Sequence, residues 1–217
     1  MNICLIPARI GSKRIKKKNI KKFYGKPLIS YAILNAKKSK LFKKIIVSTD
    51  SKSIARIAIR YGAEVPFLRP KKFSNDKATD IEVRKHFFSY CKKEKINLKY
   101  LCYLYPTTPL LKLSTLKKSF QFFKKTRYSE LMTIGKHRSP ISKSYIKKRN
   151  SEVKKVNKLK NLKEDIFYDA GQFYWYNFNS NIKKKCGFKI SAFEAVDINT
   201  MDDFEYVKKL YLLKYKK

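Results

Sequence analysis

The sequence predicts an α/β fold of three layers, in which helices cover both faces of a mostly parallel sheet. Two observations support this prediction. Short, nearly continuous apolar runs occur at Asn2–Pro7, Lys44–Ser48 and Tyr100–Tyr105, a pattern typical of strands that are buried on both faces. Segments with apolar residues at helical spacing lie between these runs, and strands that alternate with helices favour parallel pairing.

The expected helices are supported by their ends as well as by their spacing. The segment Leu28–Lys38 follows a proline, which the first turn of a helix tolerates. Ser51 is placed to cap a second helix, and Gly62 to terminate it. Thr200 is a cap residue for a helix at the end of the chain. That last helix is expected at about 200–214, and two further helices at about 79–93 and 113–124.

We interpret residues 1–217 as a single domain with one irregular insertion at about 138–168. Lysines and other polar residues dominate the insertion, and it shows little helical periodicity. It is either a mobile flap or an extended arm for dimerisation, and the arm is favoured because compact domains rarely carry such segments without a role. Further strands are expected at 131–135, 171–176 and 188–196.

The chain carries a formal net charge of +37, from 53 Lys and Arg against 16 Asp and Glu. Such a charge is typical of proteins that bind nucleic acid or an anionic membrane. Here the lysines are spread along the whole chain and form no single arm or stripe. We therefore attribute the excess to compositional bias on solvated faces, and we do not expect a nucleic acid partner.

The four cysteines lie far apart and form neither a CxxC motif nor a Cys/His cluster, so neither a zinc site nor a disulfide framework is expected. No apolar run approaches the roughly 20 residues that span a bilayer. Together these features predict a cytoplasmic protein with reduced thiols and no membrane segment.

The segment Ala8–Asn19 (ARIGSKRIKKKN) follows the first expected strand and has the composition of an anion-binding loop. Gly11 and Ser12 offer backbone N–H groups and a hydroxyl, and several cations surround them. The loop matches neither GxxxxGK[ST] nor GxGxxG, so the usual ATPase and dehydrogenase signatures are missing. By itself the loop is weak evidence, and a solvated turn in a lysine-rich chain is the favoured interpretation of it.

Four segments together resemble the CMP-sialic acid synthetase family, the cytidylyltransferases that activate nonulosonic acids. In chain order they are ARIGSKRIKKKN, GKPLISYAI, IIVSTDSKSIARIAIRYGAEVPFLRP and YPTTPLL. The segments AEVPFLRP and DAGQFYW resemble the branch that acts on pseudaminic acid. The resemblance covers nearly the whole chain.

The resemblance implies a Rossmann-like nucleotidyltransferase fold and a reaction in which the anomeric hydroxyl of an acidic nine-carbon sugar attacks the α-phosphate of CTP. Pyrophosphate leaves, and Mg²⁺ bridges phosphate oxygens. It also implies a homodimer. Arg9, Lys18 and Asp197 are the implied catalytic residues. The implied nucleotide-binding residues are Arg9, Gly11, Ser12, Lys13, Lys18, Asn19 and Arg69.

The sugar end of the site is implied to lie at the turn that begins at Tyr105. Thr107 and Thr108 are expected to bind the sugar through their hydroxyls, and Gln172 to contact it from the aromatic strand. The alternative is that the two prolines of this turn only shape the end of the strand.

The implied metal ligands are Asp197 and Asn199, and Mg²⁺ is the only cofactor expected. The family usually has two aspartates here, and Asn199 brings an amide oxygen without charge, so Asp197 is expected to carry most of the metal binding. Ile10 also departs from the family, which commonly has a small residue there. A β-branched side chain resists positive φ, so Ile10 is expected to keep ordinary backbone angles.

Three alternatives to a synthetase acting on pseudaminic acid remain open at this stage. The same chemistry on legionaminic, sialic or another ulosonic acid is one, because no motif fixes the sugar. A nucleotide-binding relative that is weakly active because of Asn199 is another. The third is a polyanion-binding protein that reuses the fold.

Overall fold

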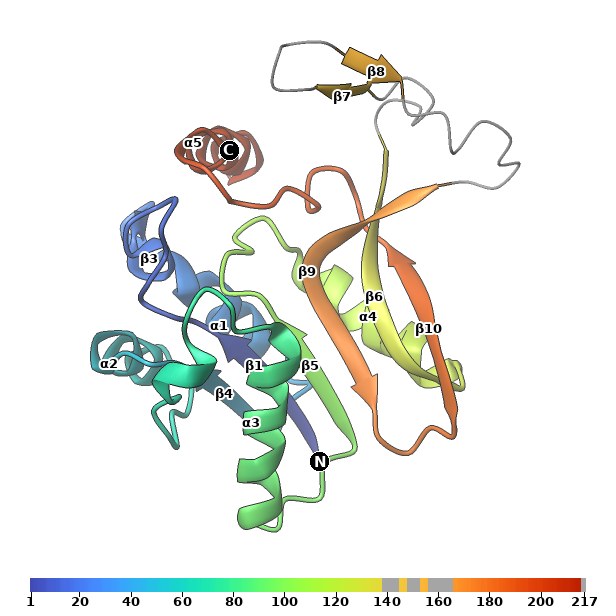
Figure 1. Cartoon of the computed structure of the whole chain (residues 1–217). Helices are drawn as coiled ribbons and strands as arrows, with labels where there is room; N and C mark the ends of the chain where they lie inside the picture. Colours follow the sequence, from blue (N-terminus) through green and yellow to red (C-terminus); the bar gives the residue numbers. More distant parts are fainter. Residues whose placement is uncertain (138–144, 148–152, 156–165, 216–217) are drawn as a thin grey trace.

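The computed structural model describes residues 1–137, 145–147, 153–155 and 166–215. A six-stranded sheet with the order β10-β6-β9-β5-β1-β4 forms its centre (Figure 1). The strands are β1 (Asn2–Pro7), β4 (Lys44–Ser48), β5 (Tyr100–Leu104), β6 (Tyr128–Lys136), β9 (Phe167–Asn177) and β10 (Ile182–Lys189).

The sheet is mostly parallel, as the sequence predicts. β1 pairs in parallel with both of its neighbours, β4 and β5, and β10 pairs in parallel with β6. β9 runs antiparallel between β5 and β6. The carboxyl ends of β1, β4 and β5 therefore meet at one edge, where open α/β sheets bind their ligands.

Helices cover both faces of the sheet (Figure 1). Apolar residues of α1 (Leu28–Ser39), α2 (Lys52–Arg60) and α4 (Leu113–Lys125) share one core cluster, and those of α3 (Asp80–Lys93) belong to the cluster on the opposite face. This arrangement gives the three layers expected from the alternation of strands and helices.

The strand β1 shows why these segments form a doubly covered sheet. Cys4 and Ile6 lie in the cluster with α1, whereas Ile3 and Leu5 lie in the cluster with α3, and all four side chains are fully buried. Successive side chains of a strand point to opposite faces, so a continuous apolar run is stable only between two layers.

The helix α5 (Met201–Tyr215) lies beside the loop that follows β1. Its residues Phe204 and Val207 pack in a third core cluster with Ile15 of the loop and with Ile198. The two-stranded hairpin β2 (Lys22–Phe23) and β3 (Lys26–Pro27) contributes Phe23 to the same cluster. This small core holds the C-terminal segment against the basic loop.

The predicted helix caps are confirmed. The hydroxyl of Ser51 accepts a hydrogen bond from the amide of Ile54, and Thr200 accepts one from Asp203 at 3.2 Å. Thr79 caps α3 in a reciprocal capping box with Glu82. Gly62 follows α2 with a φ of +93°, a conformation that favours glycine. Short 3₁₀ helices η1 (Lys18–Ile20) and η2 (Lys71–Phe73) complete the elements near the loops.

The prediction of a last strand at 188–196 is wrong for most of its length. The strand is β10 (Ile182–Lys189), and the chain then turns at Ser191, whose hydroxyl accepts a hydrogen bond from the amide of Glu194. β10 lies at the edge of the sheet and exposes all four of its lysines, which hide its strand pattern in the sequence. The apolar residues that follow, such as Ile190 and Ala195, are buried from an irregular segment.

Most of the predicted insertion at 138–168 lies outside the described residues, so its role as an arm stays a prediction. Within it, β7 (Tyr145–Lys147) and β8 (Val153–Lys155) pair as an antiparallel ribbon. All four cysteines are free thiols. Within the described residues, none of the helices combines the length and the apolar character that a membrane crossing requires.

Candidate active site

A cavity of about 200 Å³ opens at the carboxyl ends of β1 and β5. It brings together residues from the basic loop, from the segment between β4 and α3, and from the turn after β5. Its lining is formed by Pro7, Arg9, Lys18, Asn19, Arg69, Phe73, Asn75, Ala78, Asp80, Val83, Tyr105, Pro106 and Thr107. Six of the residues that the sequence assigns to nucleotide and sugar thus line one cavity.

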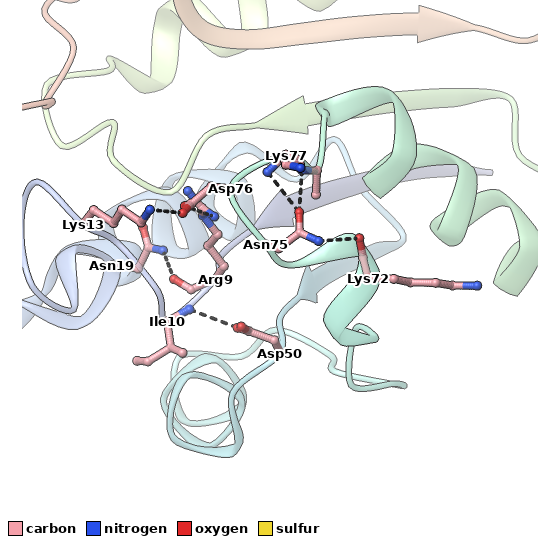
Figure 2. A network of polar contacts seen from close by, with 10 residues as sticks. Arg9, Ile10, Lys13, Asn19, Asp50, Lys72, Asn75, Asp76 and Lys77 are labelled. Atoms are coloured by element: carbon pink, nitrogen blue, oxygen red, sulfur yellow. Dashed lines mark hydrogen bonds and ion pairs between the residues drawn. The ribbon is translucent and has the colours of Figure 1, made fainter.

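Hydrogen bonds hold the basic loop in place beside this cavity (Figure 2). The amide of Ile10 donates to Oδ1 of Asp50, which follows β4, at 3.0 Å. The side-chain amide of Asn19 donates to the carbonyl oxygen of Arg9 at 2.8 Å. Ile10 is absent from the described residues with positive φ, as its β-branched side chain predicts. The loop is therefore fixed at both of its ends.

Two cations of the loop share one carboxylate. Nη1 of Arg9 lies 2.8 Å from Oδ1 of Asp76, and Nζ of Lys13 lies 2.5 Å from Oδ2 of the same residue. These hydrogen bonds lower the pKa of Asp76, with the contribution of Lys13 first. Gly11, between the two cations, has no neighbouring atom within 4 Å of the place where a Cβ would lie. The backbone here is thus open to a ligand.

Lys18 joins the basic loop to the C-terminal segment. Its Nζ donates a hydrogen bond of 2.5 Å to the carbonyl oxygen of Ile198. Burial lowers the pKa of Lys18, and the nearby carboxylate of Asp197 partly opposes this effect. Lys18 therefore places a partly desolvated cation where the cavity meets the Asp197 segment.

Arg69 is a buried cation that faces the cavity, with only 5% of its surface exposed. Its Nε donates to the hydroxyl of Ser74 at 3.0 Å, and burial lowers its pKa. None of the ion pairs in the described part of the chain includes Arg69. The structure therefore does not show Arg69 as part of a surface salt bridge. A desolvated guanidinium is well suited to an anionic or strongly polar ligand.

The lining of the cavity also includes a carboxylate held by two tyrosines. Asp80 accepts a hydrogen bond from the hydroxyl of Tyr103 at 2.7 Å and another from that of Tyr105. Burial raises the pKa of both hydroxyls. Both Asp80 and Tyr105 line the cavity. The first turn of α3 is thereby linked to the turn at which the sugar is expected.

The other residues expected at the sugar end are not equally accessible. Thr107 lines the cavity, whereas Thr108 lines a separate pocket of about 300 Å³ and donates its hydroxyl to the carbonyl oxygen of Tyr105. Gln172 is 1% exposed, and its side-chain amide donates to the carbonyl oxygens of Ala170 and Val196. In this structure the side-chain amide of Gln172 is therefore hydrogen-bonded within the protein, and its contact with a sugar stays a prediction.

Asp197 and Asn199 lie close together, although not at the end of a strand as expected. The side-chain amide of Asn199 donates to Oδ2 of Asp197 at 2.6 Å, and its Oδ1 accepts a hydrogen bond from Arg14 at 2.7 Å. Their proximity arises from the turn before α5, because β10 ends at Lys189. In the described residues no group of three or more His, Cys, Asp or Glu side chains is placed to hold a metal ion.

The residues of this region that were not identified from the sequence include Arg14, Asp76 and Asp80. Arg14 belongs to the basic loop but is one cation among many, so nothing distinguished it. The two aspartates carried a usable signal, because carboxylates are scarce in this chain and both lie in the polar segment just before and at the start of α3. A phosphate site is expected to gather cations and not carboxylates. Charge complementarity therefore offered no reason to expect the two aspartates there.

Comparisons with known proteins agree with this geometry. The model of the cytidylyltransferase family matches residues 3–216. A pseudaminic acid cytidylyltransferase of Campylobacter jejuni is 34% identical over 97% of this chain and 96% of its own length. A CMP-N,N'-diacetyllegionaminic acid synthase of Legionella pneumophila is 30% identical over 96% and 95%.

A solved structure supports the fold. A CMP:2-keto-3-deoxy-manno-octonic acid synthetase in complex with CTP superposes with a TM-score of 0.72, at 13% identity, over 98% of this chain and 99% of the other. At that level of identity the likeness concerns the fold alone. The family match and the identity over the full length show more: this chain is a member of the cytidylyltransferase family of enzymes.

Proposed function

We propose that this enzyme transfers the cytidylyl group of CTP to the anomeric hydroxyl of a nonulosonic acid, with pseudaminic acid as the favoured substrate. The cavity that brings Arg9, Lys18 and Arg69 together carries this proposal. It offers cations to a triphosphate on one side and the turn at Tyr105 to a second substrate on the other. The 34% identity with a pseudaminic acid cytidylyltransferase supports the choice of sugar.

The residues of the chain supply positioning and charge in this reaction. Transfers at phosphorus depend chiefly on holding the reactants in line and on stabilising the charge that develops on phosphate oxygens. We assign the outer phosphates to Arg9 and Lys13, which lie together around Asp76, and Lys18 is more buried and lies near Asp197. Lys18 is therefore the cation we assign to the α-phosphate, where the new bond forms and pyrophosphate departs.

We also propose that the reaction requires Mg²⁺. The donor set fits a site that the substrate helps to complete, because Asp197 is exposed and Mg²⁺ is commonly held by one or two carboxylates plus substrate phosphates. When bound, the ion would offset charge on the phosphates. Asn199 directs its amide nitrogen, not its oxygen, at Asp197. It would become a ligand only after its side chain turns, so Asp197 is the principal ligand of this proposal.

A second candidate is the same chemistry on legionaminic acid. The 30% identity with a legionaminic acid synthase over nearly the full length favours it. The polar residues that line the cavity at the sugar end, Tyr105 and Thr107, do not by themselves discriminate between such sugars. Sialic acid and other ulosonic acids belong in the same comparison.

The test is an assay of pyrophosphate release from CTP and Mg²⁺ with a panel of nonulosonic acids, in which the product mass identifies the CMP-sugar. A higher kcat/KM with pseudaminic acid than with the other acids supports the proposal. A higher kcat/KM with legionaminic or sialic acid than with pseudaminic acid changes the assigned substrate. CTP binding without release from any acid would identify a nucleotide-binding relative without efficient catalysis.

We further propose that the enzyme is a cytoplasmic homodimer. The four free thiols suit a reducing compartment, and the family resemblance supports the dimer. Light scattering coupled to size-exclusion chromatography distinguishes a particle of twice the 25.7 kDa chain from a monomer.

A further inference from the structure

The ion pairs of Asp76 engage two cations that a bound nucleotide would also need. Asp76 contacts both Arg9 and Lys13, each through a different carboxylate oxygen, and Figure 2 shows these contacts together. The same two cations are those to which we assign the outer phosphates of CTP. An anion of the protein thus already holds the donors that an anionic ligand needs.

A carboxylate and a phosphate compete for such donors for two reasons. They accept hydrogen bonds from the same N–H groups, and they repel each other when both lie against the same cations. The triphosphate carries several charges and many acceptor oxygens, whereas Asp76 carries a single charge. Ion pairs between exposed groups contribute little to stability, so a polyphosphate is able to displace this one.

The turn that carries Asp76 has its own hydrogen bonds and lies between two anchored residues. Oδ1 of Asn75 accepts hydrogen bonds from the amides of Lys77 at 3.0 Å and Ala78 at 2.9 Å, so the turn keeps its own shape. The chain is anchored before the turn by the bond between Arg69 and Ser74. After the turn it is anchored by the capping box at Thr79. The exposed residues Asn75, Asp76 and Lys77 lie between these anchors.

We propose that Asp76 is an internal competitor for the polyphosphate: it occupies Arg9 and Lys13 in the ligand-free enzyme and is displaced, with its turn, when phosphates bind. The identity of the ligand as CTP rests on the function proposed above. The competition lowers the affinity for CTP and, for the same reason, for the pyrophosphate that leaves. Asp76 thereby helps the site to release a product that would otherwise stay bound to the two cations.

The experiment measures binding of sodium tripolyphosphate, pyrophosphate and CTP by calorimetry at low ionic strength. Asp76→Asn removes the charge and keeps the shape. Asp76→Glu keeps the charge and should behave as the wild type. Glu64→Gln is the matched control, because it breaks an exposed ion pair with Lys44 and changes the net charge by the same amount, and neither residue lines the cavity. Circular dichroism verifies that each variant is folded.

We expect Asp76→Asn to bind tripolyphosphate and pyrophosphate roughly two- to tenfold more tightly than the wild type, with the difference shrinking as salt increases. Glu64→Gln should leave both affinities unchanged. Equal or weaker binding by Asp76→Asn would overturn the proposal and make Asp76 a residue that only orients Arg9. A third outcome is that Asp76→Asn binds tripolyphosphate more tightly than the wild type, while CTP binds no more tightly than tripolyphosphate. That outcome would support the competition and overturn the proposed function instead. Absence of binding in wild type and variant alike would overturn both.

Discussion

Lys18 Nζ lies 2.5 Å from the carbonyl oxygen of Ile198, a residue 180 positions further along the chain. This hydrogen bond joins the loop after the first strand to the segment that carries Asp197. It places a cation and a carboxylate together at the end of the cavity where the cytidylyl group is expected to transfer.

Replacing Lys18 by Ala should reduce kcat/KM for CTP by about 10- to 100-fold, because hydrogen bonds to a charged group contribute about 1.5–3 kcal/mol. Steady-state kinetics with varied CTP measure the effect. Lys16→Ala is the control, since it removes an exposed lysine of the same loop. Equal losses in the two variants would mean that only the overall charge of the loop matters.

The affinity for CTP should fall as the pH rises through the pKa of Lys18. Burial lowers that pKa below the ordinary 10.5, and bound phosphate favours the protonated form and raises it again. Between the two values, binding takes up a proton. Calorimetry in buffers of different ionisation enthalpy detects this uptake, and Lys18→Met should abolish it. A pH-independent affinity up to pH 10.5 would contradict the assignment of Lys18 to a phosphate.

Replacing Asn199 by Asp should raise the affinity for Mg²⁺ in the presence of CTP by roughly three- to tenfold, because a second carboxylate would lie beside Asp197. Titration of Mg²⁺ into the CTP complex measures the change. Asn199→Ala removes the amide contact with Asp197 without adding a carboxylate. It therefore separates the effect of an added ligand from the effect of losing that contact. If the affinity of Asn199→Asp equals that of the wild type, position 199 lies outside the metal shell.

Replacing Tyr103 by Phe should lower the free energy of unfolding by about 1–3 kcal/mol, since Asp80 loses one of its two tyrosine donors in a desolvated setting. Urea denaturation measures this loss. Tyr206→Phe is the matched control, because Tyr206 is 44% exposed. A similarly small effect in both variants would show that water replaces the hydroxyl of Tyr103.

The local patterns of the sequence were sufficient for much of the fold. The apolar run of β1 predicted a doubly covered strand, and Ser51, Thr200 and Gly62 marked the ends of helices correctly, because these signals act over a few residues. The edge strand β10 was placed wrongly since its exposed lysines carry no strand signal. Apolar residues just after it are buried by tertiary packing without forming a strand.

The sequence by itself also pointed to Arg9, Lys18 and Arg69, three cations of segments that resemble the family, and these three line the cavity, whereas Lys13, which was assigned with them, is not part of its lining. Only the tertiary structure decided how they are paired. Asp76 pairs with Arg9 and Lys13 of the basic loop, and Asn199 turns its amide nitrogen to Asp197 and its oxygen to Arg14. Such pairings join residues far apart in the chain, and they depend on side-chain directions that no local pattern encodes.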